Sequence, residues 1–217
     1  MEVWIASHLG DAMREQTLLL AFDSIKNNAQ QPDAVWISYS SAIKVNISMW
    51  QDRLGQIPLH VLVQPKKTMQ FQHFQFIAEQ AHESNAIITF LDDDDLVDPL
   101  KYATLQNYFD SHPSASVVCH PISRFGKYSY RLVKDVDSIA SYEKEANGPN
   151  EYFCLAIKFA VVRRWFINRI NRQTLRKHKA TTDMTFGSRY MRYVKHHKIN
   201  KVLQYQRVQS IVNHYWP

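Results

Sequence analysis

Strand-like and helix-like segments alternate along the first 120 residues of this 217-residue chain. Short apolar runs that fit buried strands are separated by stretches in which apolar side chains recur with the helical period. The expected strands are 3–7, 34–38, 59–63, 86–91 and 116–120, and the expected helices are 11–28, 42–54, 70–83 and 99–111. This alternation predicts an α/β fold with a central, mostly parallel sheet flanked by helices.

Helix-start signals support two of these boundaries. Asp11 is a suitable N-cap for the first helix, and Asp98 with Pro99 forms a typical N-cap and first-residue pair for the fourth. Beyond residue 120 the alternation is less regular. There we expect a strand pair or hairpin at 127–133, a polar loop at 141–150 and a strand leading into a helix at 153–162. Further on we expect a basic segment at 163–179 that is helical or partly mobile, a helix at 183–196 and a strand at 202–208.

No internal repeat or low-complexity linker interrupts the chain, so we expect one domain over residues 1–217. It divides into a half made of residues 1–120 and a basic half made of residues 121–217, and it is compatible with being part of a longer chain. No apolar run approaches the roughly 20 residues that cross a bilayer, and no signal-peptide pattern is present. Cys119 and Cys154 lack metal-type spacing and suit a reducing compartment, so we expect a cytoplasmic protein.

Charge is distributed unevenly along the chain. Residues 1–151 carry 12 Lys/Arg and 19 Asp/Glu, whereas residues 152–217 carry 14 Lys/Arg and a single acid, Asp183. The balances of −7 and +13 add to the net charge of +6. A basic segment of this kind can face nucleic acid, a phosphorylated ligand, an anionic membrane or an acidic partner, and the charge alone does not choose among them.

The fourth expected strand ends in four consecutive carboxylates, Asp92, Asp93, Asp94 and Asp95. In extended geometry Asp92 and Asp94 share one side and Asp93 and Asp95 the other. Such a run can be a solvated acidic turn, or it can bind a hard cation, since Mg²⁺ and Mn²⁺ prefer carboxylate and phosphate oxygens. Its place at the carboxyl end of a strand, where ligands bind in parallel sheets, favours a site. The five glycines form no Gly-rich phosphate-binding motif.

The order of three motifs resembles a known family. The segments are Phe90–Asp95, Thr181–Arg189 around Asp183, and Arg207–His214. Together with the alternating elements they resemble the GT-A fold glycosyltransferases, and most closely the inverting, family-2-like members. More narrowly, the chain resembles the amino-terminal glycosyltransferase domain of a chlorovirus capsid-glycosylating protein. The resemblance implies a hexosyltransferase-type enzyme that moves a sugar from a nucleotide-diphosphate sugar to an acceptor hydroxyl of a glycan or glycoprotein, with inversion. Residues 1–120 would bind the nucleotide sugar, and 121–217 would form the acceptor and catalytic half.

The same resemblance assigns roles within the acidic run and beyond it. Asp94 would be the main ligand of Mn²⁺ or Mg²⁺, with Asp92 contacting the metal and the donor ribose, and Asp93 and Asp95 in supporting roles. His214 is the candidate for a further metal ligand or phosphate contact, and Arg207 for a fixed charge that neutralises the diphosphate.

Asp183 is the proposed general base, which takes the proton from the acceptor hydroxyl as that hydroxyl attacks the anomeric carbon. An N-cap aspartate at a helix start is the alternative interpretation, and the two roles are compatible.

Donor recognition is expected at the ends of the first three strands. Ala6, Ser7 and His8 would hold the nucleotide, Tyr39 would stack on the base, and Lys66 or Lys67 would reach phosphate. The family's acid at the end of the second strand is replaced by Ser38-Tyr39-Ser40-Ser41, yet a UDP-sugar is the donor that the resemblance favours.

Three other functions stay open at this point. A nuclease or phosphoryl or nucleotidyl transferase acting on nucleic acid also combines carboxylate-bound metals with a basic surface. The basic half lacks the binding signature of a known nucleic-acid module, however, so we expect no nucleic-acid partner. A nucleotidyltransferase that makes the nucleotide sugar shares the fold class, but Ser7–Asp11 supplies no Gly-rich signature. The third is a carbohydrate-binding domain with a degenerate site.

Overall fold

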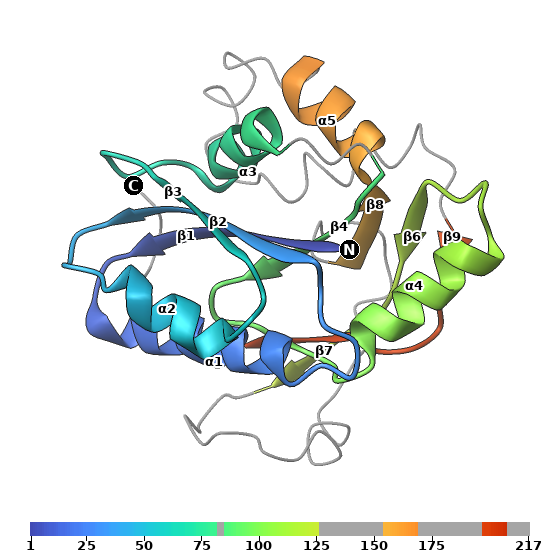
Figure 1. Ribbon diagram of the computed structural model, residues 1–217, viewed down its shortest axis with the longest axis horizontal. Coiled ribbons are helices and arrows are strands. Elements are labelled where there is room, and N and C mark those ends of the chain that lie inside the picture. The colour runs from blue at the N-terminus through green and yellow to red at the C-terminus, as the bar shows by residue number, and fades with distance from the viewer. Residues whose placement is uncertain (82–84, 126–153, 169–196, 208–217) are drawn as a thin grey trace.

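The computed structural model describes residues 1–81, 85–125, 154–168 and 197–207. Its centre is a seven-stranded sheet with the order β3-β2-β1-β4-β8-β6-β9 (Figure 1). The strands are β1 (Glu2–Leu9), β2 (Ala34–Ser41), β3 (Leu59–Val63), β4 (Ile87–Asp92), β6 (Val117–Cys119), β8 (Leu155–Lys158) and β9 (His197–Lys198).

Most neighbouring strands of this sheet are parallel. β1 pairs in parallel with both β2 and β4, β2 with β3, and β6 with β9. The exception is β8, which lies antiparallel between β4 and β6. The prediction of an α/β fold with a mostly parallel sheet is therefore confirmed, and the antiparallel strand comes from the less regular second half of the sequence.

Helices cover both faces of the sheet (Figure 1). α1 (Ala12–Lys26), α2 (Ile47–Leu54) and α4 (Lys101–Ser111) lie on one face, and α3 (Gln70–Gln80) and α5 (Phe159–Asn168) on the other. Two hydrophobic cores result. The α1 face buries Phe22, Trp50 and Tyr102, and the α3 face buries Trp4, Phe74, Phe90 and Phe166. Burial of this apolar surface against the sheet is the main favourable contribution to folding.

Three predicted helix boundaries were wrong by several residues. α2 begins at Ile47 instead of residue 42, because the side chain of Asn46 accepts the backbone N–H of Met49 as an N-cap. α3 ends at Gln80 instead of residue 83. α4 begins at Lys101, not at residue 99, because the Asp98 carboxylate accepts the N–H of Leu100 in a turn that precedes the helix. Leu100 is the N-cap, so the N-cap and first-residue roles predicted for Asp98 and Pro99 were wrong. The N-cap role predicted for Asp11 is confirmed by its contact with the Arg14 N–H.

A second, small sheet joins distant parts of the chain. It has the order β5-β10-β7, formed by Leu96–Val97, Gln204–Arg207 and Ile122–Phe125. β10 confirms the strand expected at 202–208, and β8 leading into α5 confirms the expectation for 153–162. Because β10 pairs antiparallel with β5 directly after the acidic run, residues about 110 positions apart in the sequence lie together there.

The expectations for 127–133, 141–150 and 183–196, and for the part of 163–179 beyond residue 168, lie outside the described residues. Within the described part, no helix is both long enough and apolar enough to span a bilayer. Cys119 and Cys154 are both buried.

Candidate active site

The acidic run lies where two central strands end. Ala6 of β1 is in register with Asp92, the last residue of β4. The N–H of Asp95 donates to the carbonyl of Asp92 at 3.2 Å, so the chain turns within the run before β5 begins. The four carboxylates consequently stand at the carboxyl edge of the sheet, as expected for a ligand site in this architecture.

Exposure divides the four carboxylates into two pairs. Asp93 and Asp95 are each 1% exposed, whereas Asp92 and Asp94 are only partly buried. A buried carboxylate needs hydrogen-bond or charge partners inside the protein. A partly exposed one can also reach a ligand. Asp92 and Asp94 are therefore the two members of the run that can contact a substrate.

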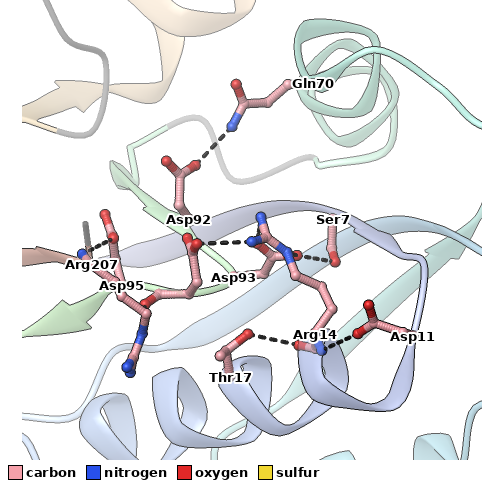
Figure 2. Close-up of polar contacts among 10 residues, drawn as sticks. Ser7, Asp11, Arg14, Thr17, Gln70, Asp92, Asp93, Asp95 and Arg207 are labelled. Atoms are coloured by element: carbon pink, nitrogen blue, oxygen red, sulfur yellow. Dashed lines mark hydrogen bonds and ion pairs between the residues drawn. The ribbon is translucent and has the colours of Figure 1, made fainter. Parts of the chain in front are cut away.

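Asp93 is held by β1 and α1. It accepts the hydroxyl of Ser7 at 2.5 Å, and the guanidinium of Arg14 contacts both of its oxygens, Nε at 3.1 Å and Nη2 at 2.6 Å (Figure 2). Burial raises the pKa of Asp93 to about 6; the Arg14 charge opposes this shift and the Asp94 charge adds to it.

Arg14 also connects Asp93 to Asp94. Its Nη1 donates to Oδ2 of Asp94 at 2.8 Å. Burial alone would lower the pKa of Arg14, but the charges of Asp93 and Asp94 raise it overall, so the guanidinium stays cationic. On the other side, Nε of Arg207 donates to the backbone carbonyl of Asp94 at 3.0 Å. Two arginines, one from α1 and one from β10, therefore flank Asp94.

Asp92 faces α3. The side-chain amide of Gln70, the first residue of that helix, donates to Oδ1 of Asp92 at 2.7 Å (Figure 2). Asp92 therefore has a neutral partner, while the neighbouring Asp93 has a charged one.

Asp95 is held by β10. It accepts the backbone N–H of Arg207 at 2.9 Å and the side-chain amide of Gln204 at 3.2 Å. The other end of that amide accepts Nζ of Lys101, which is fully buried, at 2.5 Å. Burial raises the pKa of Asp95 well above its usual range, and the Asp92 and Asp94 charges add to the rise. Burial also lowers the pKa of Lys101 to about 7.

Neutral polar side chains lie at the ends of β1, β2 and β3. Nδ1 of His8 lies 2.9 Å from the hydroxyl of Ser40, and Nδ1 of His73 lies 2.8 Å from the hydroxyl of Ser38. Gln64 donates to the same Ser38 hydroxyl at 3.2 Å. Burial lowers the pKa of His73 to about 4, and burial followed by the Lys67 charge lowers the pKa of His8. Both imidazoles are therefore neutral near pH 7.

Two residues predicted to bind the donor are placed less favourably. The ring of Tyr39 is 5% exposed and packs against Trp50 with ring centroids 5.0 Å apart, so core packing already uses its surface. A ring packed in this way leaves little surface for stacking on a base. Lys66 and Lys67 are both exposed, and Lys67 lies close enough to His8 to affect its pKa. Lys67 is thus the better phosphate candidate of the two.

The family model for glycosyl transferase family 2 matches residues 12–203. The chain belongs to this family. Among curated proteins no relative matches.

Solved structures share the fold of this family 2 chain. S. aureus TarS matches with a TM-score of 0.65 and 13% identity, over 95% of this chain and 36% of TarS. TarS 1–349 in complex with UDP-GlcNAc matches with a TM-score of 0.63 and 11% identity, over 97% of this chain and 59% of that one. The mannosyltransferase PcManGT from Pyrobaculum calidifontis, in complex with GDP-Man and Mn²⁺, matches with a TM-score of 0.56 and 12% identity, over 99% of this chain and 57% of PcManGT.

The chain thus spans less than two thirds of the length of each of these structures. The expected GT-A fold is confirmed, while the narrower chlorovirus resemblance gains no support from these comparisons.

Family 2 enzymes of this fold typically use a divalent cation. The residues present fit such a cation if the substrate phosphates supply part of its ligands. Within the described ranges, no three His, Cys, Asp or Glu side chains are arranged to hold a metal ion. Mg²⁺ and Mn²⁺, however, are commonly bound through one or two carboxylates plus substrate phosphates. Asp94 and Asp92 suit that shared arrangement, but they do not form an all-protein cage.

Sequence reasoning missed several residues of this family 2 site. Arg14 could have been found, because α1 starts at the sheet edge where the acidic run ends, so a cation in its first turn lies near the carboxylates. Gln70, Lys101 and Gln204 carried no comparable signal, because only the tertiary fold brings them to the run. The predicted Asp183 and His214 lie outside the described residues.

Proposed function

We propose that this chain binds a nucleotide-diphosphate sugar at the carboxyl ends of β1 and β4 and transfers the sugar to an acceptor hydroxyl. The observation that supports this most directly is the pair of partly exposed carboxylates, Asp92 and Asp94, beside Arg14 and Arg207. Carboxylates can share a cation with a diphosphate, and arginines can neutralise its remaining charge. Family membership favours sugar transfer over the nuclease, nucleotidyltransferase and binding-domain alternatives.

In the proposed reaction each group of residues has a distinct task. A Mn²⁺ or Mg²⁺ ion bound between the carboxylates and the diphosphate would act as a Lewis acid for the leaving group. Asp94, with Asp92, would supply the protein ligands, and Asp92 would also contact the donor ribose. Arg207 would place a fixed positive charge where the leaving nucleoside diphosphate gains negative charge. Asp93 and Asp95 support the other two from inside the protein.

For the donor base we propose uracil. The support is the family resemblance, and the neutral side chains His8, Ser40 and Gln64, which stand where related enzymes commonly carry an acid, are the groups that could contact the base. Of the matched structures, one TarS structure is a complex with UDP-GlcNAc, and PcManGT is a complex with GDP-Man. Ala6 and Ser7 of β1 were also expected to hold the nucleotide, but they are only 6% and 4% exposed and the Ser7 hydroxyl already donates to Asp93. Lys67 is therefore the proposed contact for the donor phosphate.

We further propose that Asp183 is the general base and that the reaction inverts the anomeric carbon. His214 would contact the metal or a phosphate. The acceptor is a glycan or glycoprotein hydroxyl. Replacing Asp183 with Asn should abolish transfer while nucleotide-sugar binding survives, because only the proton acceptor is removed. Turnover in the Asp183→Asn variant at the wild-type rate would refute this role.

The deciding experiment measures thermal stabilisation by nucleotide sugars with and without Mn²⁺. A ligand at a hundredfold excess over its Kd should stabilise the protein by about 2.7 kcal/mol. We expect a Mn²⁺-dependent shift with a UDP-sugar that Asp94→Asn removes. Asp110→Asn, a change at an exposed carboxylate on α4, is the matched control and should leave the shift intact. If no nucleotide sugar gives such a shift, the proposed function fails.

A further inference from the structure

Arg14 has an unusual position for a cation next to a metal-binding carboxylate. It projects from the first turn of α1 to the end of β4 (Figure 2). Three of its contacts go to the acidic run, two to Asp93 and one to Oδ2 of Asp94. A guanidinium carries five N–H donors in a planar fork, so two donors have no partner among the described residues. The side chain of Arg14 is 30% exposed, so these donors can meet a ligand.

Asp93 fixes the orientation of this guanidinium. The contacts of Nε and Nη2 of Arg14 with the two oxygens of Asp93 fix the plane of the guanidinium. Asp93 itself is anchored by the Ser7 hydroxyl and lies almost completely inside the protein. Neither partner can therefore rotate freely, and Nη1 of Arg14 is held against Asp94.

This geometry affects how a divalent cation can reach Asp94. One carboxylate oxygen already carries a cationic hydrogen bond, and a second positive charge arriving at the same carboxylate is repelled by the guanidinium. The described residues also supply no three-ligand cage that could offset this repulsion. A nucleoside diphosphate would supply the missing ligands and would offset the repulsion with its negative charge. Its oxygens can also accept hydrogen bonds from the remaining N–H groups of Arg14.

We propose that Arg14 is a built-in counter-ion that keeps a divalent cation off Asp94 until a nucleoside diphosphate arrives, so that cation and nucleotide bind together. This inference deepens the proposed function and rests on it. In the nucleotide-free protein Arg14 neutralises Asp94. In the complex the remaining Arg14 donors bind the phosphate oxygens while Asp93 keeps the guanidinium in place.

The test is Mn²⁺ binding by the full chain without nucleotide, measured by electron paramagnetic resonance of free Mn²⁺ and by calorimetry. Wild type should bind Mn²⁺ weakly, and UDP should tighten binding. In Arg14→Gln, nucleotide-free Mn²⁺ affinity should rise about tenfold or more, because the competing charge is gone. Arg14→Lys keeps a positive charge and should stay near wild type. Arg53→Gln, which loses an exposed arginine paired with Asp23, is the matched control and should not change Mn²⁺ affinity.

A second variant covers the case in which Arg14→Gln does not fold. The double variant Arg14→Gln with Asp93→Asn removes the buried pair as a unit, which is tolerated better than breaking it. It should also bind Mn²⁺ more tightly than wild type. Unchanged or weaker nucleotide-free Mn²⁺ binding in the folded variants would overturn the counter-ion role. That outcome is distinct from failure of the proposed function, in which wild type shows no Mn²⁺-dependent binding of any nucleotide sugar.

Discussion

The two buried carboxylates of the acidic run are stabilised in different ways on its two sides. On the α1 side, Asp93 forms a direct ion pair with Arg14. On the β10 side, Asp95 is linked to Lys101 only through the amide of Gln204, which accepts from the ammonium and donates to the carboxylate. Both carboxylates are 1% exposed, but the Arg14 side chain is 30% exposed while Lys101 is fully buried.

This difference separates a cation that can take part in ligand binding from one that cannot. Arg14 stands at the sheet edge and contacts Asp94 as well as Asp93, which is why we propose that its charge is available to a diphosphate. Lys101 lies behind the run, and its contact with Gln204 holds β10 against Asp95. On the α1 side, Arg14 therefore sets the charge next to Asp94. On the β10 side, the contacts of Lys101 and Asp95 with Gln204 fix the position of the strand that carries Arg207.

The largest effect should come from breaking the direct ion pair. Arg14→Ala leaves Asp93 buried without its charged partner, and we expect a loss of about 3–5 kcal/mol in the free energy of unfolding. Urea unfolding monitored by tryptophan fluorescence measures it. Arg53→Ala, which breaks the exposed pair with Asp23, should cost no more than about 1 kcal/mol. Equal losses in the two variants would show that burial of Asp93 does not distinguish the α1 side.

Breaking the relayed contact should have a smaller effect. Gln204→Leu leaves Lys101 and Asp95 each without one hydrogen bond, and we expect a loss of about 2–3 kcal/mol. The same urea measurement applies, and Gln106→Leu, on the surface of α4, should change stability by less than about 0.5 kcal/mol. A loss larger than that of Arg14→Ala would reverse the ranking of the two sides.

The smallest effect should appear in the pH dependence of stability. The pKa of Lys101 is about 7 in the folded protein against an ordinary value of 10.5, so the unfolded chain binds more protons between these values. The free energy of unfolding should therefore gain a contribution of about 2 kcal/mol as pH rises from 7 to 9.

Comparison with Lys101→Met isolates this contribution, because the variant should lack the rise that wild type shows. Lys44→Met, at an exposed position, should keep the wild-type profile. If wild type and Lys101→Met had parallel profiles, Lys101 would not titrate as its burial implies.

The amino-acid sequence was sufficient to predict the fold class, and it also indicated the sheet edge at which we propose the site. Helical and strand periods are local patterns, so the alternation up to residue 120 could be read without knowing which elements pack together. The carboxyl ends of parallel strands meet at one edge, so Asp92–Asp95 could be assigned to a ligand-binding position. Helix ends were less predictable, because local side-chain contacts decide them, such as the N-cap contact of Asn46 and the turn formed by Asp98.

The division of the four aspartates was predicted in part, but their partners became known from the tertiary structure. Burial agrees with the expected alternation, since Asp93 and Asp95 are inside and Asp92 and Asp94 are partly exposed. The hydrogen-bond partners of the aspartates do not follow this alternation. The strand ends at Asp92, and the turn after it lets Arg14 reach both Asp93 and Asp94. Partners such as Gln204 are about 110 residues away in the sequence. Local patterns contain no information on contacts across such separations, so the charge balance of the run depends on how β10 and α1 pack around it.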